Sequence, residues 1–174
     1  VNAKVPSWKN MLGSLVDRAR ADGLLTDDGQ SDLKVALEDP GKWLAIAEQL
    51  ADEFGAGGLH GLIVKLIRDV APEPESIHMD LVNMPFSLMV TTNYDHLLED
   101  AFAATHGKMP LSFTHEDEVD ISDALWDRKQ FILKAHGDLQ RRDTLVLTRR
   151  DYRRLIYRSP GYKTLLGTIF TNHK

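Results

Sequence analysis

Apolar positions in the first third of the chain recur at the spacing of helices. After Ser7, apolar side chains at intervals of three and four residues predict an amphipathic helix that stops at Gly23. A second apolar stripe begins after Pro40, and a third ends before Pro72. Residues 7–70 are therefore predicted to form several short amphipathic helices.

The pattern changes after residue 85. The apolar run 86–91 predicts a buried strand, and the polar residues that follow it lead into an amphipathic helix. The runs 131–135 and 144–148 predict two more strands, and helical patterns follow the last of them. A strand that leads directly into a helix is typical of βα units, so the sequence predicts an α/β fold with a parallel sheet.

Composition narrows the class of protein. The 174 residues are 43% hydrophobic and 27% charged, as in one globular domain with a substantial core. No apolar run approaches the roughly 20 residues that span a bilayer, and no signal peptide is visible, so we expect a soluble cytoplasmic protein. The absence of cysteine excludes disulfides, thiolate nucleophiles and cysteine-based zinc or iron–sulfur sites. Because the chain begins with Val1, we expect a segment of a longer protein.

Charge is divided unevenly along the chain. Residues 1–127 hold 9 basic and 23 acidic side chains, whereas residues 128–174 hold 12 basic and 3 acidic ones. We favour opposite solvated faces, or an attraction between the two halves within the fold. The alternative is an acidic partner or phosphates for the basic cluster Arg141, Arg142, Arg149, Arg150, Arg153, Arg154 and Arg158. With a net charge of −5 and no nucleic-acid-binding motif, we do not expect direct nucleic-acid binding.

The residues best suited to chemistry follow two of the predicted strands. Asn93 and Asp95 come after the strand at 86–91, and His136 comes after the strand at 131–135. In a parallel sheet both strand ends can face one edge, where open α/β sheets bind ligands. An amide can orient water, a carboxylate can accept from a carboxamide, and an imidazole suits general-base catalysis near neutral pH. The combination predicts a substrate rich in hydroxyls and amides that is attacked by water.

A structural interpretation of the same residues is favoured when each is taken by itself. Asn93 and Asp95 are preferred caps of a following helix, and His136 before a glycine can be a turn residue. Only the occurrence of these side chains at two strand ends strengthens the chemical interpretation.

Two further patterns are interpreted as structural. The glycine-rich stretch 55–61 looks like a dinucleotide-binding loop, but it follows a predicted helix instead of a strand, so we interpret it as a helix–helix turn. His96, Glu99 and Asp100 offer metal-ligand types on one helical face. Because no partner from another element is identifiable, we interpret them as a solvated face and expect no metal.

Segments spread over most of the chain resemble the sirtuin family. Thr91–Glu99 resembles the segment in which that family's Asn and Asp face the nicotinamide riboside of NAD, and Lys134–Asp138 resembles the segment with its catalytic histidine. Residues 3–8 resemble the stretch after the family's glycine-rich loop, and residues 144–148 and 151–152 its continuation in the bacterial branch. The resemblance implies a Rossmann-like parallel sheet with helices on both faces and an inserted helical module.

The resemblance also implies an organisation and a branch of the family. Residues 1–174 are expected to form a single sirtuin-like domain fragment, with the helical module at 24–85 and the strand–helix part of the nucleotide-binding core at 86–174. The module resembles that of bacterial defence members, among them the Thoeris effectors and the proteins paired with short Argonautes, which hydrolyse NAD. The lack of cysteine excludes the zinc ribbon of the protein deacylases. The glycine-rich loop would precede Val1, so the fragment is expected to be inactive alone.

The resemblance implies an NAD glycohydrolase of bacterial antiviral defence, which releases nicotinamide and ADP-ribose and uses NAD as its substrate without a metal. Asn93 and His136 are then the catalytic residues, and Thr92 and Asp95 bind the substrate. We expect a homo-oligomer or a defence partner protein. The alternatives are a module that binds NAD or ADP-ribose without turnover and, with less support, a protein deacylase.

Overall fold

The computed structural model describes residues 5–158 and 160–172, which form two compact units. Among the described residues, the helical unit contains 5–72 and 147–152, and the sheet unit contains 73–146, 153–158 and 160–172. Ala3 and Lys4, which belong to the segment that resembles the stretch after the glycine-rich loop, lie outside the described residues.

The helical unit consists of short amphipathic helices, as the apolar stripes predict. Its elements are α1 (Trp8–Ala21), α2 (Asp27–Ala36), the 3₁₀ turn η1 (Pro40–Lys42), α3 (Trp43–Phe54) and α4 (Ala56–Val70). The predicted start of the first helix is confirmed, because Ser7 Oγ accepts a hydrogen bond from the Asn10 N–H at 3.2 Å. Of the glycine-rich stretch 55–61, only Gly55, with a φ of 72°, forms the expected turn between α3 and α4. Residues 56–61 are the first residues of α4, so the rest of the predicted turn is helical.

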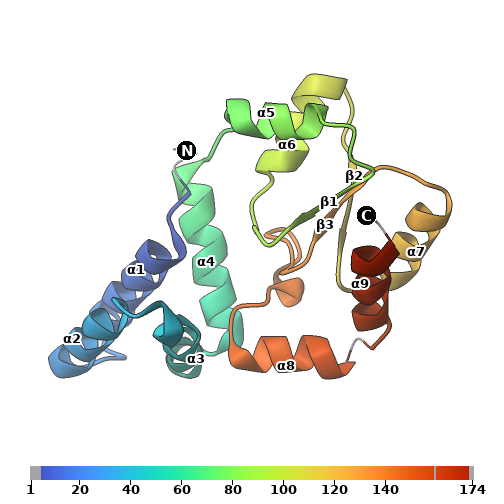
Figure 1. The fold of residues 1–174 in the computed structure, drawn as a ribbon. Helices are drawn as coiled ribbons and strands as arrows, with labels where there is room; N and C mark the ends of the chain where they lie inside the picture. The colour runs from blue at the N-terminus through green and yellow to red at the C-terminus, as the bar shows by residue number, and fades with distance from the viewer. Residues whose placement is uncertain (1–4, 159, 173–174) are drawn as a thin grey trace. The chain divides into compact units, whose positions relative to one another are not determined.

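The sheet unit is built around three parallel strands (Figure 1). Its elements are α5 (Ser76–Asn83), β1 (Leu88–Thr91), α6 (Leu97–His106), β2 (Leu111–Thr114), α7 (Glu118–Trp126), β3 (Phe131–Lys134), η2 (Arg142–Thr144) and α9 (Pro160–Asn172). The strand order is β1-β3-β2, so β3 is central, and both of its pairings are parallel. All four residues of β3 are buried, which fits its continuous apolar sequence.

Helices cover both faces of this sheet. On one face, Met89 and Ile132 pack with Val82 of α5 and Phe102 of α6. On the other face, a second cluster joins the sheet to α7 and α9 and contains the buried residues Ile121, Ala124, Phe131, Leu133, Tyr162 and Ile169. The predicted α/β class, with a parallel sheet and helices on both faces, is confirmed.

One predicted strand is wrong, and one strand was not predicted. Residues 145–148 are buried but pair with no strand, and helix α8 (Arg149–Arg158) follows them. Backbone N–H groups of this segment form hydrogen bonds outside any strand pairing. The Val146 N–H donates to the His136 carbonyl at 3.0 Å, and the Leu147 N–H donates to Asp151 Oδ2 at 3.1 Å. The third strand is β2, which lies at an edge and has only one buried residue, Thr114, so its apolar signal is weak.

None of the helices in the described part of the chain is both long enough and apolar enough to cross a membrane.

Candidate functional site

The three strands end together at one edge of the sheet. Lys134, the last residue of β3, is the register partner of Thr91 at the end of β1 and of Thr114 at the end of β2. The register confirms the predicted shared edge of the two strands that precede Asn93 and His136. The segments that follow the three strands therefore form the candidate site.

The segment after β1 carries the predicted substrate-binding residues. Thr92 and Asn93 are both exposed, and within the described residues their side chains make no hydrogen bond. Asp95 is 8% exposed, and its Oδ1 accepts from the Leu97 N–H at 3.2 Å at the start of α6. Neither Asn93 nor Asp95 is the N-cap of α6, which is His96 and makes no side-chain cap bond. The capping interpretation is therefore wrong, although Asp95 does accept from the first N–H of the helix.

The segment after β3 carries His136, which is partly buried. Burial lowers the pKa of its imidazole below the ordinary value of 6.5, and the nearby His115 lowers it further. Gly137 follows with a φ of 93°, and a Cβ at this position would overlap the Thr144 carbonyl. Only glycine therefore fits the turn immediately after His136.

His115 is a histidine at this edge that the sequence analysis did not single out. It directly follows β2 and is 6% exposed, and burial lowers its pKa. Its Nδ1 is buried without a hydrogen-bond partner among the described residues, and its ring centroid lies 5.9 Å from that of Tyr162. Recognising β2 as a strand would have placed this histidine at a third strand end.

Lys134 lies fully buried beneath the site. Its Nζ donates to the main-chain carbonyls of Tyr94 at 3.1 Å and Asp95 at 2.6 Å. The same ammonium forms ion pairs with Asp138 Oδ2 at 2.9 Å and Glu99 Oε1 at 3.3 Å. A buried charge needs partners of this kind to offset the loss of its hydration.

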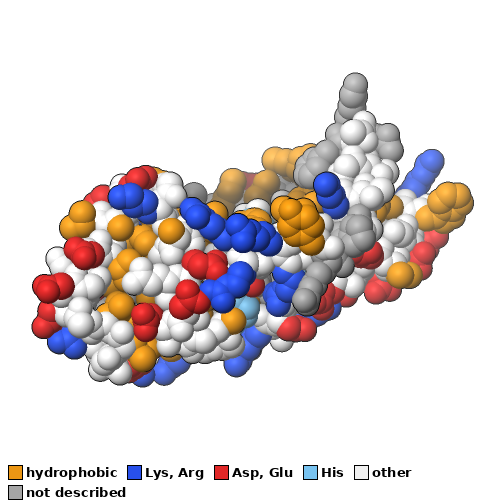
Figure 2. Space-filling view, turned by 90° about the horizontal axis from the view of Figure 1, so that it is seen from below, with side chains coloured by type: hydrophobic (Ala, Val, Ile, Leu, Met, Phe, Trp, Pro, Cys, Tyr) orange, Lys and Arg blue, Asp and Glu red, His pale blue; other side chains and the backbone are white. Residues whose placement is uncertain are grey.

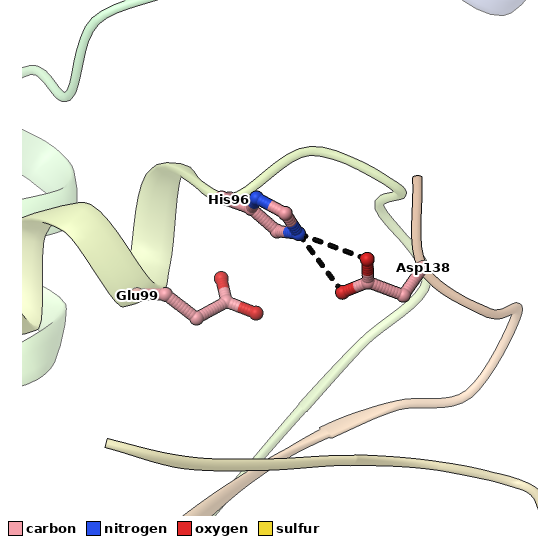
Figure 3. Close-up of side chains that lie close together, drawn as sticks. All are labelled: His96, Glu99 and Asp138. Atoms are coloured by element: carbon pink, nitrogen blue, oxygen red, sulfur yellow. Dashed lines mark hydrogen bonds and ion pairs between the residues drawn. The ribbon is translucent and has the colours of Figure 1, made fainter. Parts of the chain in front are cut away.

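Asp138 forms an ion pair with Lys134. It also contacts the imidazole of His96, as Figure 3 shows. His96 Nε2 lies 2.9 Å from Asp138 Oδ1 and 3.0 Å from Oδ2, and this contact raises the pKa of the imidazole. Burial opposes ionisation of Asp138, but hydrogen bonds from His96 and Lys134 outweigh it and hold the pKa of the carboxyl far below its usual range. This group of charges is called the Lys134 cluster below, and it comprises His96, Glu99, Lys134 and Asp138.

The solvated-face interpretation of His96 and Glu99 is wrong. Glu99 is 3% exposed and accepts from Ser112 Oγ at 2.9 Å, and only Asp100 is exposed as expected. His96 and Glu99 line a pocket of about 200 Å³ together with Asp138 and Ser112. The partners that bury this face come from β2, from β3 and from the segment after β3, which the local pattern of a helix cannot show.

The Lys134 cluster has ligand types that a metal can use. The nearest ligand atoms of His96, Glu99 and Asp138 lie within 4.8 Å of one another. The Lys134 ammonium, however, already contacts both carboxylates of this group. A divalent ion there would meet a buried positive charge at close range, so the geometry favours the ammonium as the cation of the cluster.

Part of the basic cluster is paired with acidic side chains inside each unit. In the helical unit, Arg150 forms ion pairs with Glu48 and Asp52. In the sheet unit, Arg141 pairs with Asp117 at 2.5 Å and Glu116 at 3.5 Å. The side chain of Arg158 lies outside what the structure describes. Basic and acidic side chains also lie next to each other on the face drawn in Figure 2. These pairs agree with the second of the two favoured interpretations, an attraction between the two halves within the fold.

Two comparisons with known proteins bear on this site. A family model described as a SIR2-like domain matches residues 87–174, half of the chain, and this stretch contains Asn93, Asp95 and His136. NAD(+) hydrolase ThsA of Enterococcus faecium is 29% identical over 122 residues, which are 66% of this chain and 24% of that protein. The chain therefore spans about a quarter of the length of this relative.

Proposed function

Because the chain belongs to the SIR2-like family, we propose that it carries the catalytic part of an enzyme that cleaves NAD into nicotinamide and ADP-ribose. The similarity to NAD(+) hydrolase ThsA supports NAD as the substrate. The resemblance of the helical module to bacterial defence members supports a role as an antiviral effector, acting as a homo-oligomer or with a partner protein. A cytoplasmic location belongs to the same proposal.

One observation carries the proposal. Asn93 and His136 each lie two residues beyond the register pair Thr91 and Lys134, on adjacent parallel strands. Both residues thus follow one edge of the sheet at equivalent positions. Asp95 and Thr92 belong to the same segment as Asn93, so one substrate can meet all four residues.

The chemistry that these residues suit is hydrolysis of the bond between nicotinamide and ribose. The bond breaks with its electron pair on the pyridine nitrogen, so nicotinamide leaves as a neutral molecule and needs no general acid. The ribose passes through an oxocarbenium-like state, to which the oxygen of water adds. We assign Asn93 to the water or ribose, and His136 to the proton that the water gives up. A neutral imidazole can accept that proton, and burial favours the neutral form of His136.

Asp95 and Thr92 complete the substrate contacts in this proposal. The second oxygen of Asp95 can accept from the carboxamide of nicotinamide while Oδ1 holds the start of α6. Thr92, which lies beside Asn93, is assigned to the substrate as well. No step of this mechanism calls for a metal ion.

The proposal is tested by incubating the full-length protein with NAD and separating the products by chromatography. We expect nicotinamide and ADP-ribose in equal amounts. A cyclic product would replace water by an intramolecular nucleophile and overturn the hydrolysis. Saturable binding of NAD by calorimetry with no nicotinamide in any activated state would support a binding module instead, and turnover of acyl-lysine peptides would support a deacylase.

A further inference from the structure

We propose that Lys134 is a positioning residue for this site. Its ammonium fixes the segment that carries Asn93 and Asp95 against the segment that carries His136. The inference rests on the proposed function for its effect on rate. The contacts of Lys134 themselves are independent of any substrate.

The ammonium holds the main chain directly after Asn93. It donates to two successive carbonyls, those of Tyr94 at 3.1 Å and Asp95 at 2.6 Å. The Tyr94 carbonyl also accepts from the Leu139 N–H at 3.2 Å, which joins this segment to the one after β3. The backbone between Asn93 and α6 is therefore tied to β3 and to the turn after it.

The Lys134 side chain also connects the residues that precede and follow His136. Lys134 lies two residues before His136, and its ion-pair partner Asp138 lies two residues after it. The Asp138 carboxylate also contacts His96, and the Asp138 N–H donates to Thr144 Oγ1 at 3.0 Å. A shift of the ammonium would therefore change both strand ends at once.

Two functions of Lys134 must be separated, because it also balances charge. Removing the ammonium alone leaves the buried carboxylates of Glu99 and Asp138 without it, and such a variant can fail to fold. The double variant Lys134→Met with Glu99→Gln removes one charge of each sign. The amide that Glu99→Gln introduces keeps an oxygen that can accept from Ser112 Oγ, so that hydrogen bond is preserved. Asp138 keeps His96 as its partner.

The test measures nicotinamide release by the full-length protein in the Lys134→Met variant and in the double variant. The matched control is Lys129→Met, which removes an exposed lysine paired with Asp127 at 2.7 Å. Positioning predicts that the double variant folds but that its kcat/KM stays lower by on the order of 100-fold, the cost of a misplaced catalytic group. The control should keep the original rate. Restoration of the original kcat/KM by Glu99→Gln would overturn the proposal, because Lys134 would then only balance charge.

A second readout does not depend on NAD cleavage. The Leu97 and Leu139 amides are bonded to Asp95 Oδ1 and the Tyr94 carbonyl, so both report on the held segment. In the double variant their hydrogen exchange should be about tenfold faster or more, while amides of α1 in the helical unit keep their rates. Unchanged exchange at both amides would overturn the positioning role. If the original protein releases no nicotinamide, the proposed function fails, and the exchange data still decide the role of Lys134.

Discussion

Thr91 and Lys134 are register partners at the ends of the adjacent parallel strands β1 and β3. The chain leaves both strands at the same edge, and Asn93 and His136 follow at the same offset. This relationship is the structural basis of the proposed NAD-cleaving site. Lys134 links the two segments, because its ammonium contacts the Asp95 carbonyl and the Asp138 carboxylate.

Replacing Gly137 by alanine should destabilise the protein strongly. Gly137 has a φ of 93°, and a Cβ would overlap the Thr144 carbonyl. We expect Gly137→Ala to lower the free energy of unfolding by about 3 kcal/mol or more, measured by urea denaturation. Gly167→Ala in α9 is the matched control, because nothing lies within 4 Å of the added Cβ. It should raise stability by about 0.5–1 kcal/mol, and equal effects of the two changes would refute this account of the turn.

The pH dependence of NAD cleavage should report the lowered pKa of His136. An imidazole can act as a general base only in its neutral form, and burial together with His115 lowers the pKa of His136 below 6.5. Activity should therefore persist as the pH falls through 6.5 and be lost only as it falls through the lowered pKa. In a plot of kcat/KM against pH, the acid limb should have its midpoint below pH 6.5. The substitution His115→Phe should move that midpoint to a higher pH, because His115 lowers the pKa of His136. A limb centred above 6.5 would contradict the assignment of His136 as the base.

Chelators should leave the activity unchanged. The ammonium of Lys134 contacts Asp138 at 2.9 Å and Glu99 at 3.3 Å, so the one described group of potential metal ligands already has a cation. We expect the same rate of nicotinamide release before and after dialysis against EDTA. A loss of activity on dialysis that added zinc or magnesium restores would show that a metal takes part.

Two tyrosines should respond differently to removal of their hydroxyl groups. The Tyr94 hydroxyl donates to the Val146 carbonyl at 2.9 Å, so Tyr94→Phe should cost about 1 kcal/mol of unfolding free energy. The Tyr162 hydroxyl is buried without a partner among the described residues, and burial raises its pKa to about 12. Tyr162→Phe should therefore leave stability unchanged or raise it slightly, as urea denaturation can measure. A larger loss for Tyr162→Phe than for Tyr94→Phe would mean that its hydroxyl is satisfied in solution.

The fold class could be predicted because its main signals are local. The strands β1 and β3 are apolar runs that end at polar residues, and α1 begins at a capping serine, Ser7. The strand β2 was not predicted because it is short and lies at an edge of the sheet. Three of its four residues are exposed or partly buried, so its apolar pattern is weak. Residues 145–148 have the composition of a strand, but their backbone bonds to His136 and Asp151 instead of to a neighbouring strand.

The candidate site could be predicted only where its signals are local in the sequence. Asn93 and His136 could be found because each closely follows a recognisable strand. His96 and Glu99 were misinterpreted because their partners, Lys134 and Asp138, lie far away in the sequence, on and just after another strand. Helical periodicity describes only which residues share a face, and it does not reveal what that face packs against.

The central claim, that Asn93 and His136 form one NAD-cleaving site, is tested most directly by the rate of nicotinamide release from NAD. The assay uses the activated full-length protein with Asn93→Ala, His136→Ala and the control Asn10→Ala, which changes an exposed asparagine of α1. We predict that each of the first two changes lowers the rate by about 100-fold or more and that the control leaves it unchanged. Full turnover in a protein that carries both Asn93→Ala and His136→Ala would contradict the account.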